Sequence, residues 1–341
     1  MKAIIHLAPS MRGLIRMKNA LAIVGNGFDI AHGLRTGYPQ FIAALPSDAF
    51  DSFRGLVEKY CVETKSWTKF EERINDLTLS CFHNAYNDDY DYDSVMKDIK
   101  EVNRTFDDIR IKLRDYLLTA TQDIVVSRLE SVSKVLDDSV YVINFNYTST
   151  VNLYSDQVFY VHGSLEENEI VLGYDYREEP CIIDYDMMKW SKHLCRERLA
   201  YIRFLKARGI TFKESSQVQS YIDDINRMQE LKESGKGFEE EDWSEFCHPE
   251  MLMEFYSVCP DQYREDTPDL DYGKIETLII LGHSLAADRR YLENIFQKLI
   301  NLKKTILFTY HGECRTELEE KIRFLSRFSP CINMCFYKAE A

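Results

Sequence analysis

One stretch decides the fold of this chain: Leu21-Ala22-Ile23-Val24-Gly25-Asn26-Gly27-Phe28-Asp29-Ile30-Ala31-His32-Gly33. An apolar run that stops at two glycines is typical of a buried strand that enters a tight turn before a helix. Gly25 permits such a turn, and Gly27 lets backbone N–H groups approach a pyrophosphate. A helix beginning near Phe28 would offer the ligand the positive end of its dipole. The stretch therefore predicts a nucleotide-binding turn.

The same stretch departs from the usual dinucleotide fingerprint. That fingerprint has a third glycine, and Ile30 stands at its position. Asn26 and Asp29 also have a simpler role open to them, because short polar side chains commonly cap helices. A tight turn without a ligand therefore stays an alternative for this stretch alone.

Length, composition and charge narrow the class of protein. The chain has 341 residues, of which 45% are hydrophobic and 13% aromatic, so it can bury a full α/β core. The formal net charge of −14 disfavours nucleic acid as a partner. No apolar run approaches membrane-spanning length, and charged residues and Pro9 interrupt the N-terminal apolar segment. We therefore expect a globular protein without a membrane partner.

Cysteine usage indicates a cytoplasmic location. The nine cysteines are scattered and form no CxxC pair. Structural zinc sites normally show two close cysteine pairs, and disulfide-rich secreted domains are usually small. We expect reduced thiols in a cytoplasmic protein, and no bound metal.

Short, widely spaced apolar runs predict parallel strands joined by long crossovers. The runs span residues 20–24, 140–145, 158–161, 278–281, 305–310 and 332–337. The sequence therefore predicts an α/β fold with a Rossmann-like parallel sheet in one domain, residues 17–341. Two helical insertions are expected, at 46–135 and 176–268, and residues 1–16 are expected to be a leader that adds nothing to the fold.

The first insertion carries a helical pattern of apolar residues, which predicts packing in a core. These residues are Val95, Ile99, Val102, Phe106, Ile109, Leu113 and Leu117.

Polar residues follow three of the predicted strands. Asn146 and Tyr147 follow one strand, His162-Gly163-Ser164 another, and Gly282-His283-Ser284 a third. Ligands of open parallel sheets lie at the carboxyl ends of the strands, so these residues and the Gly25 turn are expected to share one crevice. Each also has a simpler reading: Asn146 could hold a turn, His162 could be an ordinary buried histidine, and Ser284 could cap a helix that begins near Asp288.

The order of these motifs resembles the bacterial AbiH family, named for phage abortive infection. The resemblance rests on Gly25-Asn26-Gly27-Phe28-Asp29 with His32-Gly33-Leu34 and Tyr38, Phe145-Asn146-Tyr147-Thr148, His162-Gly163-Ser164, Gly282-His283-Ser284-Leu285 with Asp288, and Trp67 with Phe70-Glu71. It implies an anti-phage protein, with a phage trigger protein as a candidate partner and a homo-oligomer as a candidate assembly.

AbiH proteins in turn resemble sirtuin-like NAD-binding proteins, and this resemblance implies a sirtuin-like fold and roles for individual residues. It implies that His162 and Asn146 are catalytic and that Gly25, Gly27, Gly282 and Ser284 contact the nucleotide. We also predict Asp29 as a catalytic residue, and further nucleotide contacts at Asn26, Phe28, His32, Tyr147, Gly163, His283 and Asp288. Asp29 and His32 are AbiH-like rather than sirtuin-like, so they could belong to a different reaction. Thr148 departs from the sirtuin-like pattern, which often has aspartate there. The lack of cysteine pairs argues against a zinc-containing deacylase.

The expected reaction is hydrolysis of NAD or a related nucleotide. Asn146 would steer a water toward the ribose, and a neutral His162 would accept its proton. Two alternatives stay open. One is a non-catalytic sensor of a nucleotide signal, and the other is a metal-dependent, nuclease-like effector that uses Asp29, His32 and His283.

Overall fold

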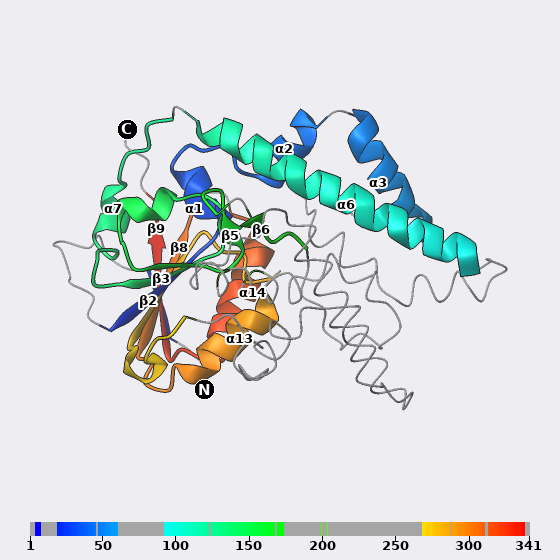
Figure 1. Ribbon diagram of the computed structural model, residues 1–341. Helices are drawn as coiled ribbons and strands as arrows, with labels where there is room; N and C mark the ends of the chain where they lie inside the picture. The colour runs from blue at the N-terminus through cyan, green and yellow to red at the C-terminus, as the bar shows by residue number, and fades with distance from the viewer. Residues whose placement is uncertain are drawn as a thin grey trace, which may run out of the picture.

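The computed structural model describes residues 4–7, 19–45, 47–60, 92–122, 124–167, 169–173, 199, 203, 268–286, 288–310 and 313–337. A seven-stranded parallel sheet lies at its centre, in the order β1-β9-β8-β7-β2-β3-β4 (Figure 1). The strands are β1 (Ile4–Leu7), β2 (Ala20–Val24), β3 (Tyr141–Asn144), β4 (Val158–Tyr160), β7 (Thr277–Leu281), β8 (Lys304–Thr309) and β9 (Cys331–Phe336). The predicted α/β fold with a parallel sheet is confirmed.

The start of the chain contributes a strand, β1, to the sheet, which we did not expect. We expected residues 1–16 to add nothing to the fold, but Ile4–Leu7 pairs in parallel with β9 at the edge of the sheet. Two β-branched residues, Ile4 and Ile5, favour a strand, and the pairing covers the edge that β9 would otherwise expose. The run is only 4 residues long, which is too short to stand out in a sequence pattern.

The strands form because alternate residues are buried on opposite faces of the sheet. In β2, Leu21 and Ile23 pack in the same cluster as side chains from α13 (Arg289–Lys298) and α14 (Arg315–Leu325). Ala22 and Val24 join the cluster on the other face, with α1 (Asn26–Ala31) and α7 (Glu130–Ser133). Figure 1 shows these helices in layers on the two sides of the sheet. Burial of both faces explains why the strands are continuously apolar.

A separate helical unit packs beside the sheet, and it consists of α2 (Tyr38–Ala44), α3 (Ser47–Tyr60) and α6 (Tyr92–Thr121) (Figure 1). Its core includes Phe53 of α3 and Phe106 of α6. The predicted apolar face of α6 is buried at Val102, Phe106, Ile109, Leu113 and Leu117, which confirms its packing role. The side chains of Val95 and Ile99 lie outside the described part.

Parts of both predicted insertions lie outside the described residues. Within 46–135, these are residue 46, residues 61–91 with the Trp67 and Phe70-Glu71 motif, and residue 123. The second range, 176–268, is described only at Leu199, Arg203 and Pro268. No helix in the described ranges is long and apolar enough to cross a membrane.

The direction of strand addition reverses between β2 and β7. From β2 the chain adds β3 and β4 on one side, and then returns to add β7, β8 and β9 on the other. Loops that follow two such neighbouring strands diverge to opposite faces and leave a crevice at their carboxyl ends. Short 3-10 helices (Thr150–Leu153 and Tyr272–Lys274) and an antiparallel pair, β5 (Gly163–Ser164) with β6 (Glu169–Ile170), complete the described elements.

Candidate functional site

The glycine turn after β2 packs directly on the turn after β7. The Gly25 N–H donates to Leu281 O at 2.9 Å, and the Gly27 N–H donates to Gly282 O at 2.9 Å. A Cβ atom on Gly27 would lie 2.8 Å from that same oxygen, and one on Gly25 would lie 2.7 Å from His283 Cα. The two glycines are therefore required by close backbone packing. This changes our explanation of Gly27, because its N–H is already bonded and does not point to a pyrophosphate.

Gly282 is the most constrained residue of this contact. Its φ is +68°, and an added Cβ would lie 2.1 Å from Phe28 N. We expect Gly282→Ala to lower the free energy of unfolding by at least about 1–2 kcal/mol, the cost of the left-handed backbone alone. Denaturant unfolding measures the change. Gly55→Ala in α3 is the matched control, because no described atom beyond its own helix backbone lies within 4 Å of its added Cβ, and it should be neutral or stabilising.

A pocket of about 370 Å³ lies beside this contact, at the carboxyl ends of the central strands. Its volume falls in the range of small-molecule sites, roughly 300–1,000 Å³. The predicted residues that line it are Gly25, Asn26, Gly27, Asp29, Asn146, Tyr147, His162, Gly282, His283, Ser284 and Asp288. The fold thus brings the ends of β2, β3, β4 and β7 together around one cavity.

Three predicted site residues lie elsewhere. Phe28 is fully buried in the core beside the sheet, and Gly163 forms part of β5 and does not line the pocket. The ring nitrogens of His32 lie 2.7 Å from Phe28 O and 2.7 Å from the Tyr154 hydroxyl. Burial lowers the pKa of His32. Phe28 and His32 therefore belong to the packing behind the turn, and Gly163 to the β5–β6 pair.

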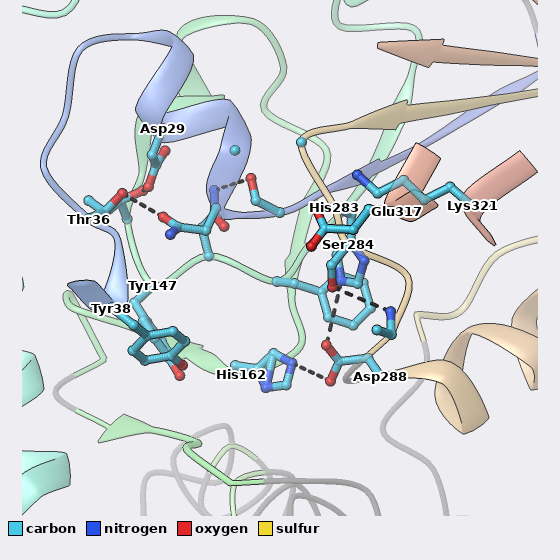
Figure 2. Close-up of a pocket in the computed structure, with 18 of the residues that line it drawn as sticks. Asp29, Thr36, Tyr38, Tyr147, His162, His283, Ser284, Asp288, Glu317 and Lys321 are labelled. Carbon is cyan, nitrogen blue, oxygen red and sulfur yellow. Dashed lines mark hydrogen bonds and ion pairs between the residues drawn. The ribbon is translucent and has the colours of Figure 1, made fainter. Parts of the chain in front are cut away.

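Two histidines share one carboxylate in the pocket. His162 Nε2 lies 3.0 Å from Asp288 Oδ1, and His283 Nε2 lies 3.5 Å from Asp288 Oδ2. Figure 2 shows both rings directed at Asp288. The Leu285 N–H donates to His283 Nδ1 at 2.9 Å, so neutral His283 carries its proton on Nε2, toward Asp288. Phe145 packs against both rings, with centroid distances of 5.3 Å to His162 and 4.4 Å to His283.

Asp29 forms the opposite wall of the pocket in Figure 2. Its side chain is 1% exposed, Thr148 Oγ1 donates to Oδ2 at 2.5 Å, and Oδ1 has no hydrogen-bond partner among the described residues. Burial raises the pKa of Asp29 to about 6, against the lowering effect of hydrogen bonds from Thr148, Thr150 and Asn146. Burial thus makes the ionisation of Asp29 costly, and perturbed acids of this kind are common at functional sites.

Asn146 and Asn26 are fixed by the same region. Asn146 Nδ2 donates to Gly25 O at 3.1 Å, and Thr36 Oγ1 donates to Asn26 Oδ1 at 2.5 Å. The Asn146 contact ties the end of β3 to the glycine turn. Asn146 therefore holds the turn, which is the simpler role considered for it above. Its side chain also lines the pocket.

One wall of the pocket comes from α13 and α14 and was not predicted from the sequence. Arg289, Glu317, Glu320 and Lys321 all line the pocket, as does Tyr38 of α2. Lys321 Nζ lies 2.6 Å from Glu313 Oε1, an ion pair that fixes the lysine. No motif marks these residues. The available signal was topological, since a helix that follows β8 begins at the same end of the sheet as the other site loops.

Comparison with known proteins identifies the family. The family model described as bacteriophage abortive infection AbiH matches residues 21–310. The chain belongs to the AbiH family. It is thus a bacteriophage abortive infection protein. Neither the curated proteins nor the solved structures gave a match.

The AbiH match has a clear relation to the pocket. It covers the turns after β2, β3, β4 and β7, which carry every predicted site residue. It ends before α14, so the wall with Glu317, Glu320 and Lys321 lies outside the matched range. The match bears out the resemblance to AbiH, and it does not extend to the sirtuin-like proteins.

The three residues named for the alternative of a metal-dependent effector are divided between the pocket and the packing outside it. Within the described ranges, no group of three or more His, Cys, Asp or Glu side chains is arranged to hold a metal ion. Of the three residues named for that alternative, Asp29 and His283 line the pocket, but His32 contacts Phe28 and Tyr154 outside it.

Proposed function

We propose that this AbiH protein binds NAD or a related nucleotide in the pocket and hydrolyses the bond between nicotinamide and ribose. The observation that carries the proposal is the His162–Asp288–His283 cluster, buried at the point where the strand order reverses. Counted along the chain from β2, the strand order is that of dinucleotide-binding sheets, which favours the Rossmann-like assignment. Fold alone does not fix function, and it is the buried cluster that favours this reaction.

The cluster supplies a general base. In the reaction, the water oxygen forms a bond to the anomeric carbon while the bond from that carbon to the pyridinium nitrogen breaks. The electron pair of that bond returns to the ring, so nicotinamide leaves neutral, and His162 accepts the proton of the water. Nε2 faces Asp288, so Nδ1 is the nitrogen that takes the proton. Asp288 orients the ring and stabilises the imidazolium that forms, and such a base contributes roughly 10²–10⁴ in rate.

The charges around the pocket suit this reaction. Positive charge develops on the ribose as nicotinamide departs, and Asp29, Asp288, Glu317 and Glu320 give the pocket walls an excess of acid. A preorganised carboxylate stabilises such charge best where water is excluded. Lys321 and Arg289 are the cationic side chains of the lining, so they are the candidates to hold the nucleotide phosphates.

The proposal is tested by incubating the purified protein with NAD and following nicotinamide release by chromatography. We expect release that depends on protein concentration. Calorimetric titration with NAD runs in parallel. Heat of binding without release would favour the nucleotide sensor, whereas neither heat nor release, with and without phage lysate as an activator, would remove NAD as the ligand.

A further inference from the structure

His162 lies on a short hairpin, and Arg203, which is far away in the sequence, joins two parts of that hairpin. The hairpin, residues 160–171, runs from the end of β4 through β5 to β6 and the residue after it. Arg203 Nε and Nη2 donate to the two carboxylate oxygens of Glu167 at 2.8 and 3.0 Å. Nη2 also donates to Tyr160 O at 2.7 Å, and the guanidinium lies over the Phe159 ring at 5.4 Å from its centroid. The Arg203 side chain therefore contacts the hairpin at residues before and after His162.

Other hydrogen bonds fix the backbone at further points of the hairpin. The Val171 N–H donates to His162 O at 2.8 Å, and the Leu165 N–H donates to Tyr147 O at 2.9 Å. These bonds hold the peptide of His162 and the first residue after β5. The turn that contains Glu167 is joined to the end of β4 through the arginine.

The geometry points to Arg203 as a positioning residue for His162: it sets the His162 ring against Asp288 by holding the hairpin closed. The inference rests on the proposed function. A guanidinium matches a carboxylate with two parallel hydrogen bonds in a rigid plane, which a lysine cannot do. The partly buried pair, with side chains 23% and 30% exposed, is also less screened than a surface pair.

The test compares Arg203→Ala and Arg203→Lys with the wild type. Misplacement of a reacting group by about 1 Å can cost about 100-fold in rate, so we expect Arg203→Ala to lower kcat of nicotinamide release by roughly 10- to 100-fold. KM should change little, because Arg203 does not line the pocket. Arg203→Lys should restore part of the loss. Arg54→Ala, which removes an exposed pair with Glu58 on α3, is the matched control and should be neutral.

A second readout does not depend on turnover. The imidazole signals of His162 are followed by NMR during a pH titration, after assignment with His162→Gln. We expect Arg203→Ala to shift the His162 midpoint, and the charge-swapped pair Arg203→Glu with Glu167→Arg to return part of the shift, because a glutamate at position 203 cannot donate to Tyr160 O. Should Arg203→Ala fail to fold, Glu167→Gln weakens the same contact with little change of shape.

The outcomes separate the two proposals. If the wild type releases no nicotinamide but the His162 midpoint moves in Arg203→Ala, the proposed reaction is wrong and the positioning role stands. If kcat and the midpoint both stay at wild-type values, or if kcat falls only as much as the folded fraction, Arg203 has no positioning role.

Discussion

Replacement of His162 by alanine is expected to leave NAD bound and to lower the rate of nicotinamide release by roughly 10²–10⁴-fold. His162 is 2% exposed, and its Nε2 lies 3.0 Å from Asp288 Oδ1, so it is placed to act as an oriented base. Asp288→Asn keeps the size of the side chain but removes its charge. It should therefore lower kcat as well, because the imidazolium of His162 loses its counterion. Calorimetry measures binding, and chromatography of nicotinamide measures turnover.

The control for these variants is Glu293→Gln on the same helix as Arg289. Glu293 pairs with Arg327 and does not line the pocket, so this change should leave both measurements unaltered. A double variant, His162→Ala with Asp288→Asn, should be little slower than His162→Ala alone, because groups that act as a unit are not additive. Full NAD turnover by His162→Ala would falsify the assignment of the base.

Gly27→Val is a poor test of nucleotide binding, although the sequence suggests it. From the sequence, a valine at this position would fill the space of a pyrophosphate. In the structure its Cβ would meet the backbone of Gly282 at 2.8–2.9 Å, so the variant would disturb the fold before it could report on a ligand. Lys321→Ala is better suited, since the Lys321 side chain lines the pocket from α14 and its removal forces no contact between backbone atoms.

Local patterns predicted the sheet because each strand is specified by its own residues. The runs around Leu21, Ile143 and Ile280 are apolar on both faces, and the structure buries all three fully. The strand ends could be assigned to one crevice because parallel strands present their carboxyl ends at the same edge. His162, Asn146 and His283 were predicted in this way, and they line one pocket.

What the sequence could not supply is pairing between distant residues. Asp288 was predicted as a nucleotide contact, and only the fold shows that it faces two histidine rings. Arg203 and Lys321 have no motif around them, because an ion pair needs one suitable partner anywhere in the chain and leaves no periodic pattern. Strand β1 was missed for a related reason, since its pairing with β9 depends on an edge that exists only after the sheet has formed.

Asp29 is the site residue for which stability and function should respond in opposite directions. Its pKa rises from 3.8 to about 6 on folding, chiefly through burial. The folded protein therefore binds this proton more tightly than the unfolded chain. The stability that the group contributes is fully present below pH 3.8, falls as the pH rises to about 6 and is absent above that. A shift of this size corresponds to roughly 3 kcal/mol.

We therefore expect Asp29→Asn to raise the free energy of unfolding at pH 8 by up to about 3 kcal/mol, with the gain vanishing below about pH 4. The amide oxygen of asparagine can still accept the Thr148 hydroxyl, which donates to Asp29 Oδ2 at 2.5 Å in the wild type. Nicotinamide release should fall by roughly 10²-fold, because the carboxylate that faces the developing positive charge is lost.

Denaturant unfolding across pH 4–8 and the release assay measure the two effects, with the exposed Asp156→Asn as a control that should change neither. A variant that is less stable than the wild type at pH 8 would show that the ionised carboxylate holds the fold together, and a variant of unchanged activity would remove Asp29 from the reaction. If Asp29→Asn is both more stable and less active than the wild type, the buried charge of Asp29 serves the reaction at a cost in stability.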